Sequence, residues 1–75
     1  MINKFKNIRK AMVDADMNVK QVATEIGISS QAFYQKLNGK TKFSLRDMLS
    51  IRDTLNNHSN EKFTLEYLFG EDDDS

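Results

Sequence analysis

The chain has 75 residues, with 11 Lys and Arg, 11 Asp and Glu, no cysteine and no proline. This length predicts one small domain, and the lack of cysteine excludes disulfides and thiolate metal sites. The sequence has no run of about 18 apolar residues and no signal-peptide core near its N-terminus. We therefore expect a cytoplasmic protein that does not cross a membrane.

The zero net charge conceals an asymmetry between the two halves of the chain. Residues 1–42 carry eight basic and three acidic side chains, and residues 43–75 carry three basic and eight acidic ones, giving +5 and −5. A polyanion would be attracted to the first half and repelled by the EDDD sequence near the C-terminus. The alternative is that these charges are the solvated faces of ordinary helices.

The first two predicted helices cover about 4–15 and 19–26. Helical spacing of apolar residues predicts that the inward face of the first comprises Phe5, Ile8, Met12 and Ala15. Asn18 is a good N-cap for the second helix, and Gln21 three residues later completes a capping box. Gly27 then ends that helix, because glycine adopts a positive φ at little steric cost.

A third helix is predicted from about 30 to 38, a fourth from about 45 to 56 and a short fifth at about 65–69. Ser29 caps the third helix, on which Phe33 and Leu37 share the buried face. Ser44 begins a second capping box, SLRD, and the fourth helix would turn Met48, Ile51 and Leu55 inward. Residues 57–62 are expected to form a polar loop. We expect a domain over residues 1–70, followed by an acidic disordered tail at 71–75.

Four apolar pairs flank the capping residues of the second to fifth predicted helices. In each, one residue precedes the cap and the other follows it by four positions, as in a hydrophobic staple. The pairs are Met17/Val22, Ile28/Phe33, Phe43/Met48 and Phe63/Leu68.

The segment VATEIGISSQAFYQKLNGK, from Val22 to Lys40, resembles the helix-turn-helix of phage repressor and Cro proteins (the XRE-like type). The flanking FSLRDMLSIRDTL and the terminal L-x-x-LF agree, so the resemblance covers about residues 3–70. It implies an all-α fold, a compact five-helix lambda-repressor-like domain with the helix-turn-helix at the second and third helices. It further implies a sequence-specific transcriptional regulator, expected to be a repressor, that acts as a homodimer on a two-fold symmetric operator of double-stranded DNA.

In this interpretation the third helix presents its first turn to base edges in the major groove. Gln31 is the first candidate reader, because its amide can donate and accept at once toward adenine. Gln35 lies one turn further on and would read a base directly or through water. Ser30 would contact a base or a phosphate, and Ala32 would pack on a thymine methyl or keep the helix close to DNA. The alternative for the polar residues is simple exposure to solvent.

Phosphate contacts are expected on both sides of this helix. The start of the second helix offers backbone N–H groups and a favourable dipole, and the loop after the third helix offers a basic cluster. The candidates are Asn18, Lys20, Tyr34, Lys36, Asn38, Lys40 and Lys42. Lys36 stands where many relatives have an aliphatic residue. Either the end of the helix is rotated slightly, or Lys36 lays its stem on the core and turns its ammonium outward.

The dimer contact is expected near the C-terminus, because one short helix reads too few base pairs for selectivity. The candidate interface residues are Leu65, Tyr67, Leu68 and Phe69. The alternative is that these residues only close the core of the single chain.

The sequence offers little support for catalysis. His58, the only histidine, lies in a polar loop, and the Asp72–Asp74 run has no partner ligands at calcium-site spacing. We expect no enzyme activity, no metal, no cofactor and no small-molecule ligand. The competing function is a protein-interaction module with the same fold, such as an antitoxin, antirepressor or phage adaptor, which the neutral net charge favours.

Overall fold

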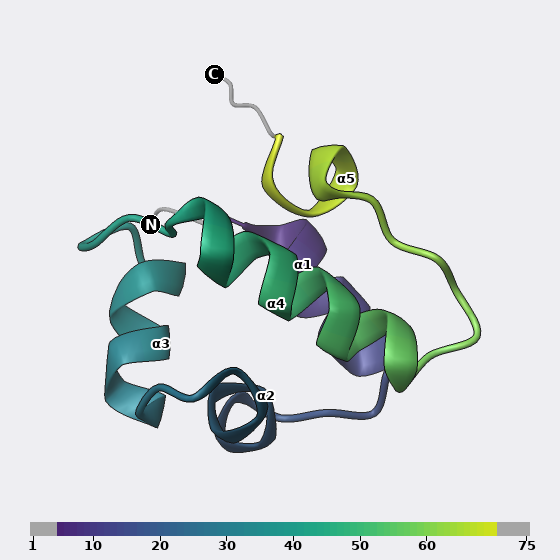
Figure 1. Ribbon diagram of the computed structural model, residues 1–75, viewed down its shortest axis with the longest axis horizontal. Helices are drawn as coiled ribbons and strands as arrows, with labels where there is room; N and C mark the ends of the chain where they lie inside the picture. The colour runs from purple at the N-terminus through teal and green to yellow at the C-terminus, as the bar shows by residue number, and fades with distance from the viewer. Residues whose placement is uncertain (1–4, 71–75) are drawn as a thin grey trace.

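The computed structural model describes residues 5–70 and contains five helices in that range (Figure 1). They are α1 (Lys6–Asp14), α2 (Val19–Ile26), α3 (Ser30–Leu37), α4 (Leu45–Asn57) and α5 (Leu65–Phe69). In Figure 1, α4 crosses the middle of the molecule in front of α1, with α3 on one side and α5 on the other. The contacts follow this arrangement, because α2 packs on both α3 and α4, while α5 packs on α1 and α4. The expectation of an all-α, five-helix fold is confirmed.

The helix boundaries follow the predicted capping signals closely. Asn18 Oδ1 accepts from the Gln21 backbone N–H at 2.8 Å, and Gln21 Oε1 accepts from the Asn18 N–H at 2.9 Å. The second capping box, of Ser44 with Asp47, is formed in the same way at the start of α4. Each box satisfies two backbone groups that the first turn of a helix leaves without a partner. Both helices therefore begin where the sequence predicts.

Three helix ends differ by one residue from the expectation, and α1 begins at Lys6, after the expected start. α1 ends at Asp14 rather than Ala15, α3 ends at Leu37 rather than Asn38, and α4 continues to Asn57 rather than ending at Asn56. Helix ends fray, and assignments vary by this amount. Phe5 precedes α1 with a left-handed backbone, φ 56°. The expected start at Lys4 and the expected tail at 71–75 lie outside the described residues.

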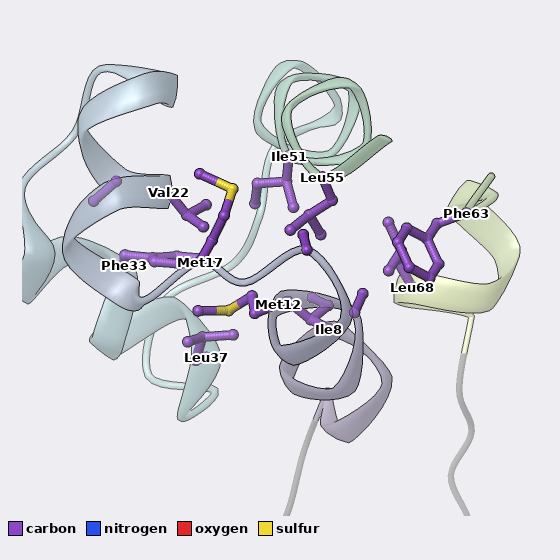
Figure 2. Close-up of a cluster of buried hydrophobic side chains, with 13 residues drawn as sticks. Ile8, Met12, Met17, Val22, Phe33, Leu37, Ile51, Leu55, Phe63 and Leu68 are labelled. Carbon is purple, nitrogen blue, oxygen red and sulfur yellow. The ribbon is translucent and has the colours of Figure 1, made fainter. Parts of the chain in front are cut away.

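Thirteen apolar residues form one buried core, drawn in Figure 2. All five helices or the turns before them contribute, and the side chains of Phe33, Ile8, Leu37, Ile51 and Leu55 have at most 1% of their surface exposed. Leu68 and Phe63 face the rest of the core from the α5 side (Figure 2). A domain of this size has one such core, so every helix is held by the same cluster.

The staple pairs mark where the chain enters each helix. Both members of Met17/Val22 and of Phe63/Leu68 are buried in the core. Ile28 is half-buried and packs against the same cluster as Phe33. The entry angles of α2, α3 and α5 are therefore fixed by apolar contact as well as by capping.

Phe43, in the turn before α4, packs edge-on against three other rings. Its centroid lies 5.1 Å from those of Phe5 and Phe69 and 6.3 Å from that of Phe33. These separations and the steep angles between the ring planes are those that aromatic pairs prefer. The ring cluster joins the turn before α4 to α3 and to both ends of the described chain.

Candidate nucleic-acid interface

α3 has one buried face and one open face. Phe33 and Leu37 lie in the core with at most 1% of their surface exposed, whereas Gln31, Tyr34 and Gln35 are exposed. The spacing of four residues puts Gln31 and Gln35 one above the other on the same side of the helix. Among the described residues, no hydrogen bond engages either amide side chain. Both are available to a ligand that approaches this face.

The remaining two candidate base readers are half-buried at the beginning of α3. Ser30 and Ala32 both lie there, one on each side of Gln31. Ser29 caps the helix, because its Oγ accepts from the Ala32 backbone N–H at 3.1 Å. The first turn of α3, which would enter a groove, is thus held in place by its own cap.

The turn between α2 and α3 depends on one glycine. Gly27 has φ 84° and ψ 27°, and its N–H donates to the Ala23 carbonyl at 2.9 Å. The Ile28 N–H donates to the same carbonyl at 2.9 Å, which returns the chain to the core. This left-handed residue ends α2 and sets the direction in which α3 leaves.

Exposed basic and amide groups lie on both sides of α3 along the chain. Asn18 and Lys20 are exposed at the start of α2, and Lys40 and Lys42 are exposed in the turn after α3. Within residues 5–70, neither Lys40 nor Lys42 uses its ammonium in an ion pair. Because the Asn18 side-chain oxygen already caps α2, only its NH₂ group remains for a phosphate.

Asn38 has a partner that the sequence does not indicate. Its Oδ1 accepts from Arg9 Nη2 at 3.5 Å, from a residue 29 positions earlier on α1. Arg9 Nε is buried and finds no partner among the described residues. Arg9 therefore belongs to the surroundings of the candidate interface, although no local motif could have indicated it.

Lys36 differs from one of the two alternatives that the sequence left open. Phe33 and Leu37 are both buried, as either alternative allows. The Lys36 ammonium is not turned out to solvent, because Nζ lies 3.2 Å from Asp47 Oδ2 and donates to the Lys42 carbonyl at 3.0 Å. The side chains of Lys36 and Asp47 are only 18% and 20% exposed. Lys36 is thus already engaged within the protein, unlike Lys40 and Lys42.

The ion pair shifts the ionisation of Asp47. Burial raises its pKa, but the Ser44 backbone N–H, together with the hydrogen bond and the charge of Lys36, outweighs burial and holds the pKa below its usual value. Asp47 is therefore a carboxylate at neutral pH, and it serves the α4 cap and the Lys36 contact at once.

The four candidate dimer residues divide into two groups. Leu68 is 2% exposed, and the half-buried Phe69 packs against the Phe43 and Phe5 rings at 5.1 and 6.3 Å. Both close the core of the single chain, and the buried Leu68 presents no surface to a second copy. Leu65 is half-buried and Tyr67 is 40% exposed. Tyr67 is therefore the exposed one of the four candidates, with the half-buried Leu65 and Phe69 beside it.

The described residues show neither a metal site nor a membrane-spanning helix. They include no group of three or more side chains suited to hold a metal ion. Over the same range, no helix has the length and apolar character needed to cross a membrane. His58 lies on the surface with its Nε2 3.3 Å from Glu25 Oε2.

The comparisons with known proteins agree with this geometry. A family model described as a Cro/C1-type HTH DNA-binding domain matches residues 7–64, which include α2, the Gly27 turn and α3. No curated protein and no solved structure gives a significant match to the chain.

Proposed function

Since the chain belongs to the family of Cro/C1-type helix-turn-helix DNA-binding domains, we propose that it is a sequence-specific transcriptional repressor of the phage repressor/Cro type. The observation that carries this proposal is α3, with Phe33 and Leu37 in the core and the opposite face open. A helix exposed along one side can enter the major groove, which is wide enough to admit it. DNA is therefore the partner for which this surface is suited.

Base recognition is assigned to the start and middle of α3. Gln31 is exposed on the first turn, where recognition helices contact base edges, and its amide matches the donor and acceptor of adenine. Gln35 extends the same row by one turn. Ser30 and Ala32 lie beside Gln31 and would complete the contact with a hydroxyl and a methyl group.

Phosphate contacts are assigned to the groups on either side of α3. Lys40, Lys42 and Asn38 follow it, and Lys20 with the Asn18 NH₂ group lies at the start of α2. The 50% exposure of Tyr34 leaves its ring and hydroxyl accessible on α3 itself. Such contacts fix the orientation of a protein on DNA and supply most of the salt-dependent affinity.

We further propose that two copies bind one operator. A single eight-residue helix contacts few base pairs, and two-fold symmetric dimers double the length of the site that is read. The exposed Tyr67 and the half-buried Leu65 are the residues that α5 offers for this contact. Because α5 has only five residues, we expect a small contact and a dimer that forms mainly on DNA.

Selection of bound duplexes from a random pool tests the function directly. The protein should enrich one consensus with two-fold symmetry, whose half-sites lie about 34 Å apart or a multiple of that distance. Recovery of duplexes without any shared sequence, at an affinity equal to that of the starting pool, would contradict sequence-specific binding.

The second candidate is a protein-interaction module with the same fold, favoured by the net charge of zero. Heparin chromatography separates the two functions, because a DNA regulator should be retained until the salt concentration is raised. A protein that passes heparin without retention and enriches no duplex would support the interaction module instead.

A further inference from the structure

The junction between α3 and α4 is closed by a small polar network. Lys36 Nζ contacts Asp47 Oδ2 at 3.2 Å and donates to the Lys42 carbonyl at 3.0 Å. Asp47 Oδ2 in turn accepts from the Ser44 backbone N–H at 3.2 Å, and Ser44 Oγ accepts from the Asp47 N–H at 3.1 Å. One side chain at the end of α3 thus contacts both the last part of the 38–44 turn and the first turn of α4.

The 38–44 turn also carries exposed basic groups beside α3. Its first part is held by backbone bonds, since the Lys40 N–H donates to the Gln35 carbonyl at 2.9 Å and the Thr41 N–H donates to it at 3.4 Å. Its last part depends on Lys36, which binds the Lys42 carbonyl, and on the Ser44 cap. The Lys42 peptide is thereby fixed while the Lys42 side chain remains in solvent.

We propose that the Lys36–Asp47 ion pair positions the phosphate-binding turn, and that Lys36 itself takes no phosphate. The pair fixes the last part of the 38–44 turn relative to α3, so that Lys42 is ordered before DNA arrives, next to Lys40, which the backbone bonds hold. This inference rests on the proposed DNA-binding function and assigns a positioning role to two residues inside it. Lys36 and Asp47 are positioning residues, and the contacts with DNA are made by their neighbours.

The sign of the Asp47 effect separates this role from a simple charge effect. Asp47 is an acid close to a surface proposed to meet a polyanion, so removing its charge should strengthen DNA binding if only the electrostatic field mattered. A positioning role predicts weaker DNA binding instead. Without the ion pair the turn is ordered only when DNA binds, and the cost of this ordering lowers the affinity. Substitution of Lys36 should weaken DNA binding for the same reason, so the two substitutions should change the affinity in the same direction.

The experiment is a double-mutant cycle of Lys36→Met and Asp47→Asn in the full chain, measured on the duplex obtained by selection. Asparagine keeps an oxygen for the Ser44 N–H and removes the charge. Each single variant should bind on the order of three- to tenfold more weakly, and the double variant should bind no more weakly than the weaker single variant, because both remove one interaction. Lys36→Arg should restore most of the affinity.

Asp53→Asn is the matched control. It also removes an acid from α4 and breaks an ion pair, that of Arg52 with Asp53 at 2.9 Å, nearly two turns further along the helix. Its affinity should stay at or slightly above that of the original protein. Thermal unfolding of every variant shows that binding is compared between folded proteins.

Amide hydrogen exchange in the free protein gives a readout that does not depend on DNA. The Ser44 amide, which donates to Asp47 Oδ2 in the last part of the turn, should exchange faster in Lys36→Met and Asp47→Asn than in Asp53→Asn. Effects of opposite sign on DNA binding, weaker for Lys36→Met and stronger for Asp47→Asn, would overturn the proposal, as would unchanged exchange at the turn. A protein that binds no duplex at all would instead overturn the proposed function, and with it the role of the pair in DNA binding.

Discussion

Gln31 and Phe33 lie two residues apart on α3, and their surroundings are opposite. Phe33 is completely buried, whereas Gln31 is exposed and has no hydrogen-bond partner for its amide among the described residues. Lys36 and Lys40 show a comparable contrast for charge, because only Lys36 is ion-paired. Exposure and pairing of the individual side chain therefore decide which residues of this segment can bind a ligand.

Gln31 and Lys40 should respond differently to truncation. Gln31→Ala should cost roughly 1–3 kcal/mol on the selected duplex and little on a scrambled one, because it removes a base contact. Lys40→Ala should weaken binding to both duplexes alike and reduce the slope of log K against log salt by about one, because it removes a phosphate contact. Titrations of both duplexes across a salt series measure the two effects. Equal losses on both duplexes for Gln31→Ala would remove it as a base reader.

At the scale of the helices, the α2–α3 pair is defined by its turn. Gly27 supplies the left-handed residue, and a Cβ built on it meets no atom within 4 Å. The need for glycine there is therefore conformational and not a matter of space. The capping boxes of Asn18 and Ser44 fix the starts of α2 and α4, also through contacts between residues three positions apart.

Gly27→Ala should destabilise the protein by about 1–2 kcal/mol, the cost of a left-handed conformation for a residue with a Cβ. Urea unfolding followed by circular dichroism measures this change in the free energy of unfolding. Thr24→Ala, an exposed position one turn earlier on α2, serves as the control and should change stability by no more than about 0.5 kcal/mol. A loss similar to that of Thr24→Ala would show that the turn does not need glycine.

At the scale of the whole molecule, the candidate DNA surface and the candidate dimer surface belong to different helices. α3 lies on one side of α4 and α5 on the other (Figure 1). Tyr67 is 40% exposed, its ring stacks on Phe63 at 5.8 Å, and its carbonyl accepts from the Asn7 side chain at 2.9 Å. Stacking on Phe63 thus packs one face of the ring, while part of the side chain remains exposed at the surface.

Tyr67→Ser should weaken association of two copies by roughly 1–2 kcal/mol, because tyrosine at the centre of an interface contributes on this scale. Sedimentation of the protein, free and with operator DNA, measures the change. Val13→Ser removes an even more exposed apolar side chain, 77% exposed on α1, and should leave association unchanged. An equal effect of both variants would indicate that the dimer uses another surface.

Most of the fold could be predicted because its signals are local. Asn18 with Gln21 and Ser44 with Asp47 lie three residues apart, and the staple pairs lie five residues apart, so the sequence displays them directly. Each joins groups that are adjacent once a helix forms. The five helices and their order were predictable for that reason, and the resemblance to the repressor and Cro proteins gave the same family as the match over residues 7–64.

The sequence by itself determined the helices, their caps and the Gly27 turn, because these depend on contacts within one or two turns of the chain. It also indicated the family, because the pattern of residues 22–40 combines these same local signals. The tertiary structure alone decided that Lys36 pairs with Asp47, that Arg9 reaches Asn38, and that Leu68 is buried within the single chain. These outcomes join residues on different helices or depend on how the helices pack. The side-chain pattern of one helix shows that a residue can be buried or paired, but only the packed helices bring the second partner within reach.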